Sequence, residues 1–390
     1  MPDEKYIEDF LKKVSFPRLS GTSHEQKAAE LIKTEIEGLE LTPKIQSFTF
    51  TSFYPRIYKK ISFILIFWLI FIFYLNINLI FSLFNVLLIF LIFIPIILIT
   101  RNPERIRIGE KRNSKNVYIN LKSQANGKVN QIATNNKLQV LFLCHIDSKS
   151  QRLSIKLRGV SVRLWIYSLL ILIPLLVLKY LFFGENLLFN LFLIILIVSH
   201  FIATFLQIIN TTHNKSPGSI DNASGICLVL DLLLFYIQKH NHLKNIDLWF
   251  IFTGSEETGT MGIRHFGNII QDYDKSKIRY FNIDSVAKAI DIFGPLKKKV
   301  NNDKFLTKFF EMAKKLNPNF HLKRYLIAVN RSDGYYLKKI GLTGLGFGDK
   351  SSYNYIHSAQ DTPDKVSAKF LGEVSEVIIK FLKEYDNTLK

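Results

Sequence analysis

Two adjacent glutamates, Glu256 and Glu257, follow an apolar run at residues 246–252 that is typical of a buried strand. Gly254 begins the turn between this run and the pair. Adjacent side chains at a strand end point in different directions, so one carboxylate can bind a metal ion while the other accepts a proton from water. Such a pair alone more often belongs to a solvated loop. With suitable companions it provides the two roles that a metallohydrolase needs.

Other metal-binding side chains stand at the edges of predicted elements. His145 and Asp147 follow a second strand-like run, Asp284 follows a third, Asp221 precedes an apolar helical stretch, and His357 lies nearer the carboxyl end. One ring nitrogen of His145 can bind metal while Asp147 accepts a hydrogen bond from the other. Each residue also has an ordinary explanation, as a core histidine, a helix N-cap or a turn residue. Their joint occurrence at element edges indicates one shared metal site.

The order of these motifs resembles the M28 family of zinc aminopeptidases, over most of the chain except two hydrophobic stretches. The motifs are His145-x-Asp147, Asp221-Asn-Ala-Ser-Gly225, Glu256-Glu257-x-Gly259, Asn282-x-Asp284, Arg331-Ser-Asp333 and His357-x-x-x-Asp361-Thr362. The N-terminal segment Phe16-Pro-Arg-Leu-Ser-Gly-Thr22 is also similar to the start of that family's domain. The motif order is specific, whereas any single motif is not.

The resemblance implies two zinc ions that share Asp221 as a bridging ligand. His145 and Asp284 would complete the coordination of one ion, and Glu257 and His357 that of the other. Two histidines and three carboxylates suit zinc, with manganese or cobalt as alternatives. Two such ions about 3.5–4 Å apart can activate a bridging water and polarise a carbonyl oxygen.

The resemblance also assigns the catalytic roles. Glu256 would be the general base that takes a proton from the metal-bridging water, and Asp147 would orient His145. The reaction would be hydrolysis of the N-terminal residue from peptide substrates. The family often has His or Asn after the Ser-Asp motif, where this chain has Gly334. This departure concerns the contacts with substrate and leaves the metal ligands intact.

Two hydrophobic stretches predict membrane-spanning hairpins. Residues 61–100 carry no Asp, Glu, Lys, Arg or His, a length that allows two crossings of about 20 residues, with a turn near Asn76, Asn78 and Asn85. Residues 164–209 hold two further apolar runs. His145 and Asp221 flank this second stretch and must reach one site, so the stretch crosses the membrane an even number of times.

We therefore expect one discontinuous catalytic domain with two inserted hairpins and about four transmembrane helices. The expected catalytic pieces are residues 1–55, 102–160 and 211–390, and the hairpins are residues 56–101 and 161–210. Strands are predicted at Val117–Leu121, Leu138–Cys144, Ile246–Phe252, Tyr280–Ile283, Ala289–Phe293 and Leu342–Phe347; helices are predicted at Glu25–Ile36, Ala223–Ile237, Lys304–Lys315 and Ser367–Tyr385. This alternation predicts an α/β fold: a mostly parallel mixed sheet covered by helices, as in zinc exopeptidases, with sites at strand carboxyl ends.

The net charge of +19 could indicate a nucleic-acid partner, but no nucleic-acid-binding motif accompanies it. Many basic residues instead flank the hydrophobic stretches: Arg56, Lys59, Lys60, Arg101, Arg105, Arg107, Arg152, Lys156, Arg158 and Arg163. They favour contact with an anionic lipid leaflet and, by the positive-inside rule, a cytoplasmic catalytic domain. The acidic N-terminal residues do not resemble a signal peptide. Cys144 and Cys227 are expected to be buried and unpaired, and the sequence favours no oligomeric state.

Two other functions compete with the peptidase. A glutaminyl-cyclase-like zinc acyltransferase resembles M28 and shares the segment His145-Ile-Asp-Ser-Lys149. The motif Asp221–Gly225 and the complete second ligand set favour hydrolysis over that reaction. A transport or receptor protein with an inactive domain is the non-catalytic alternative. No expected metal ligand is missing, and no cluster of ionisable residues lines the hydrophobic stretches, so this alternative is less favoured.

Overall fold

The computed structural model describes residues 4–125, 128–129, 137–184, 186–294, 303–316, 321–325 and 332–389. The chain forms two compact units. The sheet unit comprises residues 1–49, 112–150 and 214–390, and the helix unit comprises residues 50–111 and 151–213. The helix unit thus consists of two insertions into the sheet unit. The second insertion is longer than the predicted hairpin because its first helix begins at Ile155, before the apolar run.

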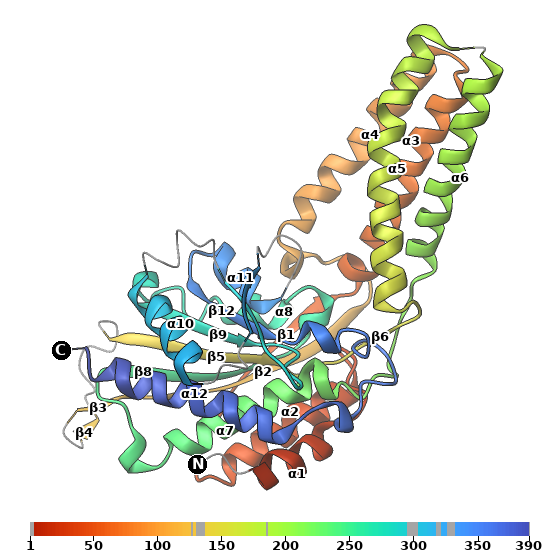
Figure 1. The fold of residues 1–390 in the computed structure, drawn as a ribbon. Coiled ribbons are helices and arrows are strands. Elements are labelled where there is room, and N and C mark those ends of the chain that lie inside the picture. The colour runs from red at the N-terminus through yellow and green to blue at the C-terminus, as the bar shows by residue number, and fades with distance from the viewer. Residues whose placement is uncertain are drawn as a thin grey trace. The chain divides into compact units, whose positions relative to one another are not determined.

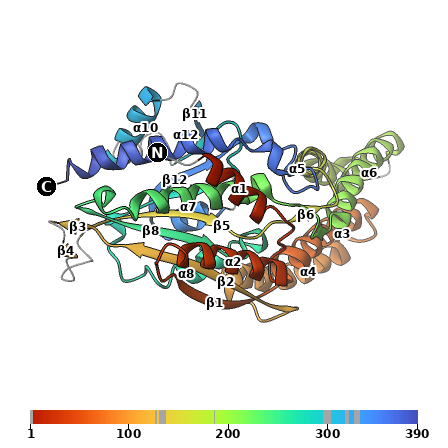
Figure 2. The same cartoon turned by 90° about the horizontal axis from the view of Figure 1, so that it is seen from below.

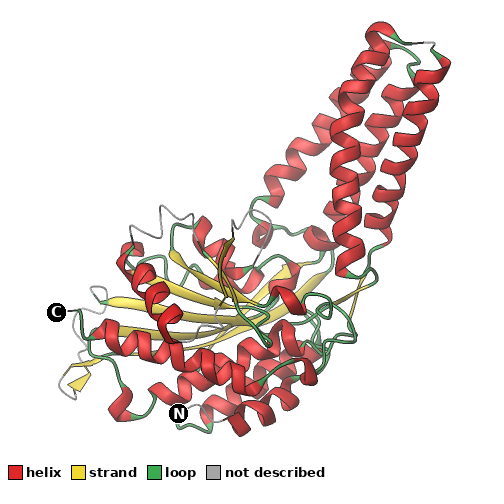
Figure 3. Cartoon of the chain, in the orientation of Figure 1, coloured by secondary structure: helices red, strands yellow, loops and turns green. Residues whose placement is uncertain are grey.

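An eight-stranded mixed sheet forms the centre of the sheet unit (Figure 3). Its strands, in spatial order, are β1 (Lys44–Thr51), β2 (Lys111–Leu121), β8 (Ile246–Thr253), β5 (Leu138–His145), β9 (Ile278–Ile283), β12 (Thr343–Gly348), β10 (Asp291–Phe293) and β11 (His321–Tyr325). The four central strands β8, β5, β9 and β12 are parallel, whereas β2 and β10 pair with this group in the antiparallel sense. The predicted fold class is confirmed.

Helices cover both faces of the sheet, and its central strands are accordingly rich in buried apolar residues. On one face α7 (Ser224–Tyr236) contacts β5, β8 and β9 and packs against α1 (Glu4–Val14) and α12 (Ala368–Asp386), which also contacts α10 (Lys304–Leu316). Figure 2 shows α7 running along the sheet beside α12, with α2 (Ser23–Glu37) nearby. On the other face α8 (Met261–Phe266) and α11 (Asp333–Lys339) contact each other (Figure 1).

Side chains of the parallel strands fill the core on both faces. Phe142 is fully buried and stacks on Phe281, with ring centroids 5.7 Å apart. Its strand neighbours Leu141 and Leu143 point to the opposite face, where they join a cluster with Phe266 of α8. A rigid sheet of this kind fixes where each strand ends, and therefore where the residues after each strand are placed.

The helix unit contains four long apolar helices: α3 (Lys59–Leu75), α4 (Leu79–Thr100), α5 (Ile155–Phe182) and α6 (Leu187–Ile209). Each is long and apolar enough to cross a membrane, α3 together with the preceding turn η1 (Phe53–Tyr58), and only 11–28% of the most apolar part of each is buried. A fifth segment, Ser219–Tyr236, also qualifies by composition, but 89% of it is buried, and it contains the core helix α7 of the sheet unit.

The turn between α3 and α4 uses two of the three predicted asparagines. Asn76 ends α3 in the left-handed conformation (φ 50°), and the side chain of Asn78 caps α4 by accepting from the amide of Ile80. The prediction for Asn85 was wrong. Asn85 lies inside α4, where its side-chain oxygen accepts a hydrogen bond from the indole of Trp68. The side-chain amide of Asn85 therefore makes a contact between α3 and α4 and does not mark a turn.

Shorter elements complete the described chain. They are the two-residue strands β3 (Gln124–Ala125), β4 (Lys128–Val129), β6 (Ser150–Gln151) and β7 (Thr212–His213), and the helical turns η1 (Phe53–Tyr58), η2 (Pro103–Arg105), η4 (Ser219–Ala223), η5 (Lys239–Asn241), η6 (Glu256–Thr258), η7 (Lys275–Lys277), η8 (Lys350–Ser352) and η9 (Pro363–Lys365).

Candidate metal centre

Three neighbouring parallel strands deliver side chains to one edge of the sheet. His145 is the last residue of β5, Asp284 directly follows β9, and Glu256 and Glu257 follow β8 in the turn η6. Because β8, β5 and β9 are adjacent and parallel, their carboxyl ends meet at the same edge. The sheet therefore brings together residues that are far apart in the sequence.

Asp221 lies between two histidines. It precedes α7 in the turn η4, and its Oδ1 is 3.1 Å from Nε2 of His145. Its Oδ2 is 3.0 Å from Nε2 of His357. The two oxygens of one carboxylate thus face two different sets of ligands.

Each set contains three residues whose donor atoms lie within 4.8 Å of one another. One set is His145, Asp221 and Asp284, and the other is Asp221, Glu257 and His357. The residues that the sequence predicted as metal ligands therefore lie together, in the predicted grouping. Imidazole nitrogens and carboxylate oxygens in such sets fit zinc or a similar divalent ion.

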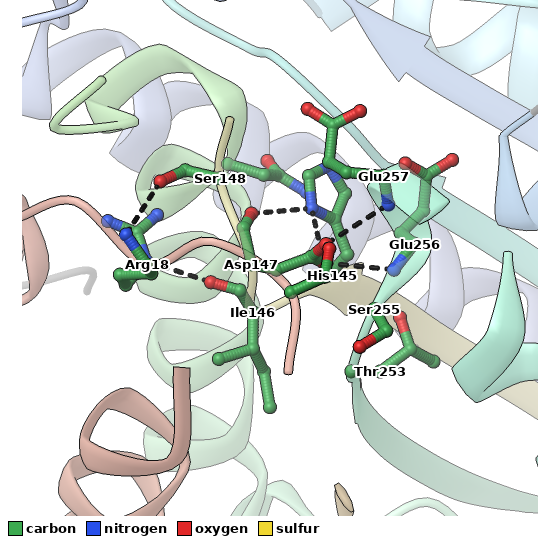
Figure 4. A network of polar contacts seen from close by, with 12 residues as sticks. Arg18, His145, Ile146, Asp147, Ser148, Thr253, Ser255, Glu256 and Glu257 are labelled. Carbon is green, nitrogen blue, oxygen red and sulfur yellow. Dashed lines mark hydrogen bonds and ion pairs between the residues drawn. The ribbon is translucent and has the colours of Figure 1, made fainter. Parts of the chain in front are cut away.

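Asp147 holds the turn that carries the two glutamates. Its Oδ1 accepts the amide of Glu256 at 2.9 Å, and its Oδ2 accepts the amide of Glu257 at 3.1 Å (Figure 4). The Ser20 hydroxyl donates to the same carboxylate. Figure 4 shows the carboxyl groups of Glu256 and Glu257 directed away from Asp147. The backbone of Glu256 is thus fixed, while its carboxyl group takes no part in these contacts.

The predicted pairing of Asp147 with His145 has a different geometry. Nδ1 of His145 lies 3.0 Å from the backbone carbonyl of Asp147 and 3.5 Å from its carboxylate. The carbonyl is therefore the nearer acceptor. With its proton on Nδ1, the ring of His145 would present an unprotonated Nε2 toward Asp221.

Strained backbone surrounds the site. Ser255, Thr260, Ser285 and His357 all have positive φ, between 53° and 66°, although none is glycine. Ser255 precedes the candidate base Glu256, Ser285 follows the candidate ligand Asp284, and His357 is itself a candidate ligand. Glu25 fixes Ser255 by accepting its amide at 2.6 Å and its hydroxyl at 3.0 Å. Such conformations persist only where surrounding contacts enforce them, which is common at functional sites.

Electrostatics distinguish the two adjacent glutamates. Burial raises the pKa of Glu256 well above its usual range, and the neighbouring carboxylate of Glu257 adds to this shift. Burial also acts to raise the pKa of Glu257, but the charges of Lys149 and His357 outweigh it and lower the pKa to about 2. Lys149 makes a direct ion pair with Glu257. The accumulated buried negative charge is the environment in which divalent cations bind.

Two motif residues that contact the site, Asp333 and Asp361, received no role in the sequence analysis. Asp361 accepts the amides of Ile220 and Asp221 at 2.6 Å and 3.3 Å. Asp333 is buried and accepts the hydroxyl of Thr253, and burial raises its pKa to about 7. Both lie within the motifs listed above, which was the available signal. Arg331 of the same motifs lies outside the described residues.

A pocket adjoins Asp284 on the sheet edge. It is lined by Tyr280, Asn282, Asp284, Phe293, Ser332, Gly334, Gly346, Phe347 and Tyr353. Aromatic rings form much of its wall. Gly334 adds no side chain to it, at the position where the family pattern often has a larger residue.

Comparison with known proteins finds a family match within this chain and a shared fold. Residues 194–382 match the model of peptidase family M28. No match was found among curated proteins. Among solved structures, an aminopeptidase from Aneurinibacillus sp. strain AM-1 is 13% identical with a TM-score of 0.57, covering 98% of this chain and 93% of its own. A zinc aminopeptidase from Bacillus subtilis is 12% identical with a TM-score of 0.56, covering 99% and 95%. A glutaminyl cyclase from Fimbriiglobus ruber is 14% identical with a TM-score of 0.55, covering 98% and 95%. Residues 194–382 therefore match a domain of peptidase family M28, and the chain has the fold of the zinc aminopeptidases.

Proposed function

We propose that this protein is a membrane-anchored aminopeptidase that uses two divalent metal ions, preferably zinc. The observation that carries the proposal is the position of Asp221, whose two oxygens lie 3.1 Å and 3.0 Å from the two histidines. A carboxylate placed in this way can bridge two ions. His145 and Asp284 would hold one ion, and Glu257 and His357 would hold the other.

When bound, the ions would supply Lewis-acid activation of a water molecule and of the scissile carbonyl group. Glu256 would take the proton from the attacking water and later donate it to the departing amine. Asp147 would keep Glu256 in place through the backbone amide.

The charge of the site favours a substrate with a free amino terminus. The ions would neutralise the three carboxylates that hold them, but the carboxylate of Glu256 belongs to neither ligand set and would attract an α-ammonium group. The pocket beside Asp284 would receive the side chain of the N-terminal residue. Both features favour an exopeptidase.

The four apolar helices of the helix unit would anchor the protein in the bilayer. The basic residues that flank them would rest against anionic lipid headgroups, each contributing about 1 kcal/mol near the surface. By the same charge asymmetry, the sheet unit would face the cytoplasm.

A glutaminyl-cyclase-like acyltransferase is a second candidate. The ion pair of Lys149 with Glu257 favours it, because an ammonium group on this carboxylate reduces the need for a second cation. Glutaminyl cyclases from several organisms also share the fold. In this case one zinc ion would suffice.

The two functions can be separated with the purified full-length protein in detergent. Metal would be counted per chain, and peptides with N-terminal leucine or glutamine would be analysed by mass spectrometry. The aminopeptidase proposal expects two ions and release of the free N-terminal residue. One ion, with loss of ammonia from the glutamine peptide and no cleavage, would establish the cyclase. Two bound ions with neither peptide cleaved and no loss of ammonia would contradict both.

A further inference from the structure

The chain between His145 and Asp221 does not itself hold these two residues together. Residues 151–213, which belong to the helix unit, intervene between them. Within the sheet unit, contacts across the insertion must therefore define the distance between the two ligands. The Ser150 hydroxyl accepts the amide of Lys215 at 3.0 Å, and the Ser148 hydroxyl donates to the carbonyl of Ser216 at 3.1 Å. These contacts join the two chain ends but do not extend to the ligands.

Arg18 extends this connection to the metal centre. Its side chain is completely buried, and burial lowers its pKa to about 10, so that it remains protonated at neutral pH. All five of its side-chain hydrogen bonds end on backbone carbonyls. The acceptors, with their distances from the guanidinium nitrogens, are Val14 (2.6 Å), Phe16 (2.9 Å), Ile146 (2.8 Å), Pro217 (2.6 Å) and Gly218 (3.0 Å).

Two of these acceptors adjoin the candidate ligands. Ile146 lies between His145 and Asp147, and Figure 4 shows Arg18 reaching its carbonyl. Gly218 begins the turn that contains Asp221, and its carbonyl also accepts the amide of Ala223 at 2.9 Å. A single planar guanidinium thus connects the strand end that carries one ligand to the turn that carries the other.

The turn has no freedom to compensate if this connection is lost. Gly218 has φ 65°, and an added Cβ would come within 2.4 Å of Ser148 and 2.8 Å of the carbonyl of Asp221. Asp361 holds the backbone amides of the same turn, because its side chain accepts hydrogen bonds from the amides of Ile220 and Asp221. Arg18 therefore donates to carbonyls of the turn while Asp361 accepts its amides, so that both sides of the turn are held.

We propose that Arg18 is a positioning residue that sets the separation of His145 and Asp221 and thereby the metal affinity of the centre. The inference rests on the proposed metal centre but not on the reaction that the centre catalyses. Lysine cannot replace arginine in this role, because an ammonium group has three donors at one point and cannot span five carbonyls.

The test compares Arg18→Lys with the parent and with Arg279→Lys as a matched control. Arg279 also donates to backbone carbonyls, those of Ser276 and Ile278, but it lies at the opposite end of β9 from Asp284. Zinc affinity of the metal-free full-length protein would be measured by competition with a chelating dye. Circular dichroism and thermal melting would be recorded alongside. We expect Arg18→Lys to lower zinc affinity about 10- to 100-fold, as loss of a group that orients metal ligands does, and Arg279→Lys to leave it unchanged.

A second variant tests the role by chemical rescue. In Arg18→Ala, added ethylguanidinium should restore zinc binding toward the parent value, whereas ethylammonium should not. Parent-like zinc affinity in Arg18→Lys would overturn the inference. Absence of rescue in folded Arg18→Ala would overturn it as well, and unfolding of Arg18→Lys would show a general structural role in its place. A parent protein that binds no zinc would instead reject the metal centre itself, and this inference with it.

Discussion

Asp221 is the residue on which both halves of the candidate centre depend. Its two oxygens face different histidines, so Asp221→Ala should weaken binding of both metal ions. His357→Ala should weaken only the ion shared with Glu257. We therefore expect metal analysis to find less metal in Asp221→Ala than in His357→Ala, which should keep about one ion per chain. Equal metal content in Asp221→Ala and the parent would exclude a bridging role.

Glu256 has a different role at the same scale. Its backbone is fixed by Asp147, but its carboxyl group belongs to neither ligand set. Glu256→Gln should therefore keep the parent's metal content and lose about 10²- to 10⁴-fold in kcat, the range typical of a general base. The rate of release of an N-terminal residue, measured at equal metal occupancy, would show this. A variant with the parental rate would assign the base to another residue.

At the scale of elements, the turn after β8 must pass through a very small space. A Cβ added to Gly254 would lie 2.2 Å from the hydroxyl oxygen of Ser114 and 2.6 Å from the carbonyl of Lys115. Gly254→Ala should therefore displace the turn and destabilise the protein by about 1–3 kcal/mol. Gly38→Ala is a suitable control, because its nearest backbone atoms lie at 3.4 Å and 3.5 Å. Thermal melts of the two variants should differ, and similar melting temperatures would show that the turn adapts.

The elements that the sequence predicted well are those with a strong apolar signal. The run at Leu138–Cys144 matches β5 because both faces of this strand are covered, which leaves no polar alternation to obscure it. The edge strand β1 (Lys44–Thr51) was missed, since only its last residues are buried. The candidate ligands were recognisable from motifs, but their supports were not. Glu25 contacts Ser255 across 230 residues, and no local pattern reports such a contact.

At the scale of the whole molecule, each insertion leaves and re-enters at one place. Ser52 donates its amide to Glu110 at 3.2 Å, and Arg152 donates its amide to Thr211 at 3.0 Å. Flexible linkers of about four residues could therefore replace residues 53–109 and 153–210. We expect the shortened chain to need no detergent and to bind zinc with the parent's affinity. An aggregated or metal-free product would show that the sheet unit requires the apolar helices.

The orientation of the whole molecule in the membrane follows from the same two insertions. Basic residues flank the apolar helices on the side of the sheet unit, so we predict a cytoplasmic sheet unit. A cysteine placed at exposed Ser351 should not react with a membrane-impermeant thiol reagent in intact cells, but should react after lysis. The native Cys144 and Cys227 are fully buried and give little background, and both can be replaced. Ile77→Cys provides the control, because Ile77 lies in the turn between α3 and α4 with 65% of its surface exposed. This turn should lie on the opposite side and react in intact cells. The reverse pattern, with Ser351→Cys labelled and Ile77→Cys protected, would place the candidate metal centre outside the cytoplasm.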